Sequence, residues 1–214
     1  MFVIMKKFFL VVVAVLFAFT ANAQIVSSTS RSISTSTEKA NGWSELTFDV
    51  GFQSMYFTED DDDSESFTGL SLNYAKAIGL SSKIPLFIRP GIGVQYSFGD
   101  MYDVDFNNLA ITPKCDVGYL FNIPNSSVGL FPYFGITSRV NVLGSLSYEG
   151  ESINIYDDDE MDGDAANRFQ LGWRIGIDAH LSNFIVGFDY GNDFMEFSDY
   201  TKLKAFTVKV GFRF

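Results

Sequence analysis

The only histidine of the chain, His180, stands two residues after Asp178 and two residues before Ser182. A histidine near a hydroxyl and an acid is typical of enzymes that activate a serine nucleophile. Side-chain alternation places His180 on the polar face of a strand, which favours a hydrogen-bonded structural histidine. No GxSxG, P-loop, HExxH or CxxC motif occurs in the sequence. We therefore expect no enzyme and no cofactor, and a lipid-modifying enzyme that uses His180 is the lesser alternative.

Two acidic runs, at 60–63 and 157–164, offer the carboxylate oxygens that Ca²⁺ prefers. The candidate ligands are Asp60, Asp62, Asp158 and Asp162. The second run begins like an EF-hand loop, but its twelfth position is Phe169 where glutamate is needed. Solvated, mutually repelling loops are therefore favoured, and no metal site is predicted. The single histidine and the lone Cys115 also argue against a His/Cys metal site.

A further set of charged residues shares one face of segments that alternate between polar and apolar residues. The set is Glu45, Asp49, Arg89, Lys114, Asp116, Arg139, Arg174, Asp178, Asp189, Lys209 and Arg213. Its acids and bases nearly balance, and charges inside a narrow structure are tolerable only when they are paired. If this face is internal, the sequence predicts an ion-pair network and no open pore.

Eight segments carry this alternation, which is the period of β-strands with two different faces. They are approximately 45–56, 67–78, 86–98, 109–121, 130–142, 169–181, 184–190 and 206–214. Glycine and charges of both signs fill one face, and large apolar residues fill the other. Pro90, Pro113 and Pro132 fall within the strands, where each removes a backbone donor, and we expect bulges there.

The connections between these segments alternate between short and long. The long connections, at 58–66, 99–108, 144–167 and 192–201, hold 20 of the 26 acidic residues. A scatter of charge over a soluble surface would not sort acids in this way. Short turns at one end, long loops at the other and an apolar outer face are features of transmembrane β-barrels.

The last strand and two internal phrases carry a family resemblance. The phrases are Arg89-Pro-Gly-Ile-Gly-Val-Gln-Tyr96 and Phe131-Pro-Tyr-Phe-Gly135, and the strand alternates Phe206, Val208, Val210, Phe212 and Phe214. Across 43–214 the chain resembles the small eight-stranded outer-membrane β-barrels, the OmpA/OmpX-like, porin-like family. The resemblance implies an all-β, antiparallel up-and-down transmembrane barrel of a Gram-negative envelope. It also implies that the C-terminal alternation is the signal for barrel-assembly machinery, and it supplies no catalytic residues.

Closure of such a barrel pairs the first strand with the last. If Glu45 lies opposite Arg213, then Asp49 falls opposite Lys209, and apolar residues meet on the outer face. We expect cysteines placed at 47 and 211 to crosslink readily if this register is correct.

The first 42 residues are expected to lie outside the barrel. Residues 1–23 have the lysines, apolar run and Ala-Asn-Ala ending of a secretory signal peptide, which predicts cleavage between Ala23 and Gln24. Residues 24–42 are predicted to be a flexible Ser/Thr-rich leader. The mature chain is expected in the outer membrane. A soluble, lipocalin-like periplasmic barrel is the structural alternative.

The formal net charge of −11 argues against a nucleic-acid partner. We expect a structural or surface-interaction role, in envelope integrity or adhesion, exerted through acidic external loops. The alternative is a narrow porin or small-solute transporter. Expected partners are outer-membrane lipid and lipopolysaccharide, whose phosphates Lys202 and Lys204 could contact, the assembly machinery and divalent cations at the loops. We expect a monomer.

Overall fold

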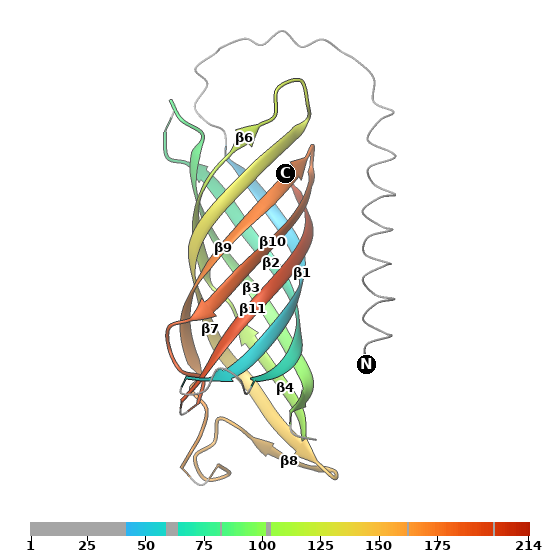
Figure 1. Cartoon of the computed structure of the whole chain (residues 1–214), viewed down its shortest axis with the longest axis vertical. Coiled ribbons are helices and arrows are strands. Elements are labelled where there is room, and N and C mark those ends of the chain that lie inside the picture. The colour runs from blue at the N-terminus through green and yellow to red at the C-terminus, as the bar shows by residue number, and fades with distance from the viewer. Residues whose placement is uncertain (1–41, 59–63, 82, 102–103, 162, 199) are drawn as a thin grey trace. The chain divides into compact units, whose positions relative to one another are not determined.

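The computed structural model describes residues 42–58, 64–81, 83–101, 104–161, 163–198 and 200–214. The predicted signal peptide lies outside these ranges, as does the leader apart from Gly42. The described residues form one antiparallel sheet (Figure 1). Its strands are β1 (Trp43–Phe57), β2 (Ser64–Gly79), β3 (Leu86–Met101), β4 (Val104–Ile111), β5 (Lys114–Tyr119), β6 (Phe121–Asn122), β7 (Val128–Tyr148), β8 (Glu151–Asn154), β9 (Phe169–Leu181), β10 (Phe184–Asp193) and β11 (Thr201–Arg213).

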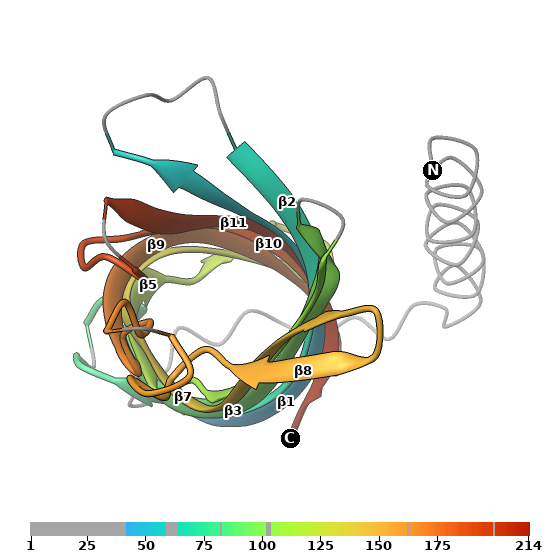
Figure 2. The ribbon, with the colours of Figure 1, turned by 90° about the horizontal axis from the view of Figure 1, so that it is seen from below.

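The sheet closes on itself into a barrel (Figure 2). β1 pairs with both β2 and β11, and the other strands pair with their neighbours around the circle back to β2. β4 and β5 each lie between β3 and β7, so β4, β5 and β6 are successive parts of one barrel strand. β8 pairs only with the protruding end of β7. The described residues therefore confirm the predicted eight-stranded antiparallel up-and-down barrel.

The two ends of the barrel differ. At the end where β1 begins and β11 finishes, here called the terminus end, the connections are short: 80–85, 123–127 and 182–183. At the opposite end, here called the loop end, β1 and β3 finish, β2, β4 and β11 begin, and β7 continues into β8. Strands run further toward the loop end than the sequence predicts, because β3 and β4 continue to Met101 and Val104. No helix among the described residues is long and apolar enough to span a membrane.

The register between the first and last barrel strands is the predicted one. Glu45 lies opposite Arg213 and Asp49 lies opposite Lys209. Thr47 is opposite Gly211, the pair considered for crosslinking. A Cβ at position 211 would stand only 2.3 Å from the Leu46 carbonyl oxygen, so cysteine does not fit there without a backbone shift. The register is confirmed, but the 47–211 pair is a poor test of it.

A better crosslink joins positions 51 and 207, which are also directly opposite on β1 and β11. A Cβ at Gly51 would make an ordinary contact of 3.5 Å with Thr207 Oγ1, so a cysteine fits there without a backbone shift and lies beside position 207. We expect Gly51→Cys/Thr207→Cys, in a Cys115→Ala background, to oxidise in the folded barrel and to migrate faster unreduced after unfolding. Absence of a crosslink, with the barrel otherwise folded, would contradict this closure.

The three prolines do not create the expected bulges. β2 and β3 keep one register on both sides of Pro90, and β7 and β9 pair continuously through Pro132. Pro113 separates β4 from β5, yet the pairing of both with β3 has a single register. The irregularity lies instead between Leu109 and Ala110 in the β4–β7 pairing. Prolines interrupt hydrogen bonding locally without shifting the strands, because only one donor is lost at each.

The two faces of the strands are arranged as in a membrane barrel. Large apolar residues point outward and stay exposed, with Phe48 at 46%, Ile92 at 53% and Phe134 at 54%. Charged residues point into the lumen, and Arg89, Asp116 and Asp178 are buried to 1% exposure or less. A soluble barrel would have these preferences reversed.

Candidate functional site: the charged interior

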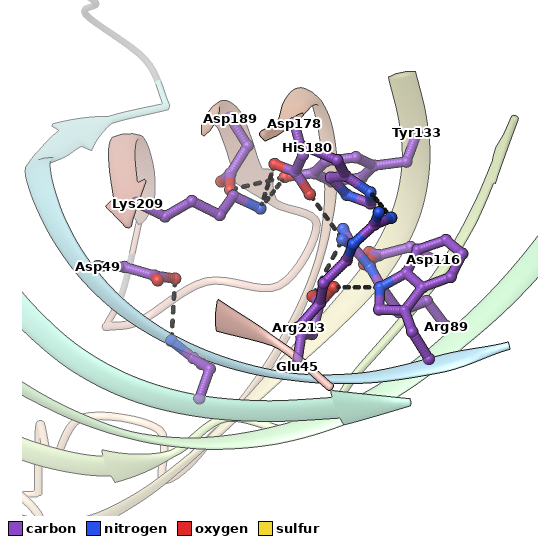
Figure 3. A network of polar contacts seen from close by, with 12 residues as sticks. Glu45, Asp49, Arg89, Asp116, Tyr133, Asp178, His180, Asp189, Lys209 and Arg213 are labelled. Carbon is purple, nitrogen blue, oxygen red and sulfur yellow. Dashed lines mark hydrogen bonds and ion pairs between the residues drawn. The ribbon is translucent and has the colours of Figure 1, made fainter. Parts of the chain in front are cut away.

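Six charged side chains form a closed cycle across the lumen, here called the charged hexad. Figure 3 labels Arg89, Asp116, Asp178, Asp189 and Lys209 of this cycle. In cyclic order its members are Arg89, Asp116, Arg174, Asp189, Lys209 and Asp178. The nitrogen–oxygen distances around the cycle are 2.9, 2.6, 3.5, 3.6, 3.0 and 2.6 Å. Positive and negative groups alternate, so each charge has two opposite neighbours, which compensates for its removal from water.

Tyr133 of β7 lies among the three cations of the charged hexad. Its aromatic ring centre is 4.4 Å from the Arg89 guanidinium, 5.1 Å from that of Arg174 and 4.6 Å from Lys209 Nζ. Lys209 Nζ donates a hydrogen bond to the Tyr133 hydroxyl, which in turn donates to Asp189 at 2.9 Å. Cation–π attraction adds to the ion pairs where water is excluded.

Glycines make room for these side chains in the crowded lumen. A Cβ at Gly187 would lie 2.1 Å from Asp178 Oδ1, and one at Gly135 would lie 2.1 Å from Asp116 Oδ1. A Cβ at Gly176 would lie 2.5 Å from the Tyr133 hydroxyl. The abundance of glycine on the polar face therefore has a steric reason, since an eight-stranded barrel has little interior space.

The other charged residues predicted to face the lumen are also inside, but their partners differ from those directly opposite. Glu45 accepts from Arg89 at 3.0 Å and does not pair with Arg213. Arg213 donates to the Ser182 carbonyl, and its guanidinium lies 3.1 Å from His180 Nδ1. Long side chains in a narrow lumen reach across it, so Cα register alone does not determine the ion pairs.

The last three members of the predicted set lie nearer the loop end. Arg139 pairs with Asp193 at 3.0 Å. Asp49 accepts a hydrogen bond from Asn73 at 2.9 Å and does not form an ion pair with Lys209, which lies opposite it. Lys114 and Asp49 both line a polar cavity of about 80 Å³. Arg174 of the charged hexad also lines this cavity, which has room for a few water molecules.

The terminus end of the lumen is filled by aromatic side chains. Ala77, Phe87, Phe131 and Tyr133 form a buried cluster against which Trp43 and Leu120 pack. His180 is fully buried beside it, with its ring 5.1 Å from that of Trp43 and 5.9 Å from that of Phe131. Ser182 contributes its carbonyl to Arg213, and its positive φ places it in the tight turn. This environment fits a structural His180 packed among aromatic rings.

The loop end is filled by a second apolar cluster, here called the loop-end cover. It contains Phe67, Phe106, Ile155, Tyr156, Ala166, Phe197 and Leu203. Tyr156 donates a hydrogen bond to Asn108 at 2.8 Å, and burial raises the pKa of its hydroxyl above the usual value. Since Leu203 also lines the polar cavity, that cavity lies between the loop-end cover and the charged hexad. The loop-end cover, the charged hexad and the aromatic cluster therefore follow one another along the lumen.

Most of the candidate calcium ligands fall where the structure gives no description. Asp60, Asp62 and Asp162 lie outside the described residues, whereas Asp158 lies in the connection that follows β8. Within the described ranges, no group of three His, Cys, Asp or Glu side chains is arranged to hold a metal ion. The preference for solvated loops over calcium binding at these runs stays a prediction, because three of the four candidate ligands lie outside the described residues.

Tyr133 and Asp193, which both contact the charged residues of the interior, were missing from the sequence-based set. Tyr133 has the same strand parity as Gly135 and Arg139, which would have placed it in the lumen. Asp193 was assigned to a connection, but it continues the alternation of Asp189 and belongs to β10. Adding Asp193 to the predicted set gives six acids and six bases, so the lumen charges balance.

The sequence matches no protein-family model and no curated protein. Solved structures do match. Neisserial surface protein A aligns with a TM-score of 0.54 at 14% identity, covering 80% of this chain and 97% of that one. The outer-membrane enzyme PagL gives 0.44 at 13% identity, covering 77% and 98%. A major outer membrane protein from Thermus thermophilus gives 0.42 at 16% identity, covering 79% and 99%.

The likeness to Neisserial surface protein A concerns the fold, since the identity is only 14%. Together with the closed strand order and the apolar outer face, the match to Neisserial surface protein A defines the class of the protein. The chain has the fold of the small eight-stranded outer-membrane β-barrels.

Proposed function

We propose that the protein is an integral barrel of the outer membrane with a structural or surface-interaction role, exerted through acidic external loops. The observation that carries this proposal is the inverted burial: charges inside, large apolar side chains exposed outside. The apolar band suits lipid, and the loop end then faces the exterior, with the chain termini on the periplasmic side. Envelope integrity or adhesion are the roles we favour.

Heating before denaturing gel electrophoresis tests the membrane assignment. A barrel whose strands are all paired resists detergent until it is boiled, so we expect different mobilities for boiled and unboiled protein from the outer-membrane fraction. Recovery of the mature chain in the soluble periplasmic fraction, with no change of mobility on boiling, would instead support a lipocalin-like barrel.

The filled lumen favours a closed barrel over a porin or transporter. The loop-end cover, the charged hexad and the aromatic cluster lie in succession along the barrel, and the ion pairs of the hexad would have to break for a solute to pass. We expect purified protein in planar lipid bilayers to give no stepwise conductance, whereas an established porin gives steps in the same bilayers. Reproducible steps from the purified barrel would favour the transport alternative.

A non-enzymatic role is part of the same proposal. His180 is buried at the terminus end, between aromatic rings and the Arg213 guanidinium, so lipid of the outer leaflet has no approach to it. This arrangement supports a packing role for His180.

A further inference from the structure

The outer surface of β10, β11 and β1 changes from aromatic to polar side chains near the loop end. Tyr190, Phe206 and Phe52 lie side by side there, because Phe206 is opposite both of the others. Two residues further toward the loop end, the same three strands present polar side chains instead. These are Asn192, Lys204 and Ser54, again aligned by direct pairing. The polar residues therefore lie at the edge of the apolar band, at the depth where lipid headgroups begin.

Together with Lys202 and Tyr56, these three polar residues form what is here called the basic row. Lys202 lies opposite Tyr56, one step beyond Lys204. Lys204 Nζ is 4.7 Å from the centre of the Tyr56 ring, which holds the ammonium group on the outer face. The Tyr56 hydroxyl donates to Asn192 Oδ1 at 3.0 Å, which leaves the amide hydrogens of Asn192 as donors.

The basic row contrasts with the acidic connections around it. Outward positions in the described residues of β1, β10 and β11 include no acid. Lys202 and Lys204 have no ion-pair partner among the described side chains. Two ammonium groups beside the amide hydrogens of Asn192 are suited to a phosphate group.

We infer that the basic row binds the phosphate of an anionic lipid in the membrane leaflet at the loop end. Its position directly beyond Tyr190, Phe206 and Phe52 places the acyl chains of such a lipid against the apolar band. A lipid phosphate reaches the basic row from within the membrane, because the row lies at the edge of the apolar band. This inference rests on the proposed outer-membrane location, and it names a lipid class and a site for the interaction.

Binding of lipid A to the full-length mature barrel in nonionic detergent tests the inference. The double variant Lys202→Gln/Lys204→Gln should bind lipid A about 30-fold more weakly than wild type, from roughly 1 kcal/mol per lysine. The matched control is Lys76→Gln/Lys83→Gln, which removes the same charge at the terminus end and should retain wild-type affinity. Dephosphorylated lipid A should bind the wild-type barrel as weakly as lipid A binds the double variant.

The inference would be overturned by equal lipid A affinity in wild type and the Lys202/Lys204 variant, by the same loss in the control variant, or by equal binding of dephosphorylated lipid A. Inorganic phosphate serves as a separate probe. If inorganic phosphate binds with an affinity comparable to that of lipid A, and this binding also requires the two lysines, the inference that the phosphate belongs to a lipid is overturned as well. The mobility change on boiling is measured on every sample. If the mobility change is kept but the Lys202/Lys204 variant binds lipid A as wild type does, this inference fails while the proposed function stands. If wild type shows no mobility change, the proposed function fails.

Discussion

Replacing Arg89 with methionine is expected to destabilise the folded barrel by about 3–5 kcal/mol, the range for removing one partner from a buried ion pair. Arg89 is 1% exposed and contacts Glu45, Asp116 and Asp178 at 2.6–3.0 Å. Methionine keeps an unbranched, flexible stem but lacks the guanidinium group, so three carboxylates would lose a shared cation in a place that water cannot easily reach. The free energy of unfolding, from urea titration of the refolded protein in detergent, measures the effect.

A rescue experiment separates electrostatics from packing. Adding Glu45→Gln and Asp178→Asn to Arg89→Met removes two of the carboxylates left without Arg89, and it should recover part of the lost stability. Lys83→Met is the control, because Lys83 is exposed in a short turn, and its effect should stay within about 0.5 kcal/mol. A wild-type free energy of unfolding for Arg89→Met would contradict a stabilising role for the charged hexad.

The strand parity and the closing register could be predicted from the sequence for a physical reason. Alternation fixes which residues share a face. Once Glu45 is aligned with Arg213, all the remaining pairs of β1 and β11 follow correctly. Side-chain partners followed a different geometry. Arg89 is long enough to meet Glu45 of β1 and Asp178 of β9 at once, and no pattern within one strand specifies contacts across the lumen.

The loop end was predicted less well, because there the outer face no longer has to be apolar. Beyond Leu143 the outward positions of β7 are Ser145 and Ser147, so the strand continues to Tyr148 without an apolar signal. Ile155 and Tyr156 follow in a segment predicted to be an acidic loop, yet both are buried in the loop-end cover. Their burial depends on space above the lumen that only the closed barrel creates.

The glycines of the lumen lead to the second large effect. Gly187→Ala is expected to destabilise the barrel by about 1–3 kcal/mol, the usual cost of overpacking an interior. The new methyl group would stand 2.1 Å from Asp178 Oδ1 and 2.9 Å from the Ile177 carbonyl oxygen. Asp178 cannot simply rotate away, because it is fully buried and holds both Arg89 and Lys209. Urea titration again gives the free energy of unfolding.

Gly51→Ala is the matched control, since it is another luminal glycine in a strand and its Cβ would meet nothing closer than 3.5 Å. Without a clash, alanine restricts the unfolded chain more than glycine does, so this variant should be neutral or more stable by about 0.4–1 kcal/mol. Gly135→Ala repeats the test at Asp116, where the Cβ distance is also 2.1 Å, and should resemble Gly187→Ala. Similar stabilities for all three variants would mean that the lumen accommodates a methyl group beside the charged hexad, and that these glycines are not required by packing.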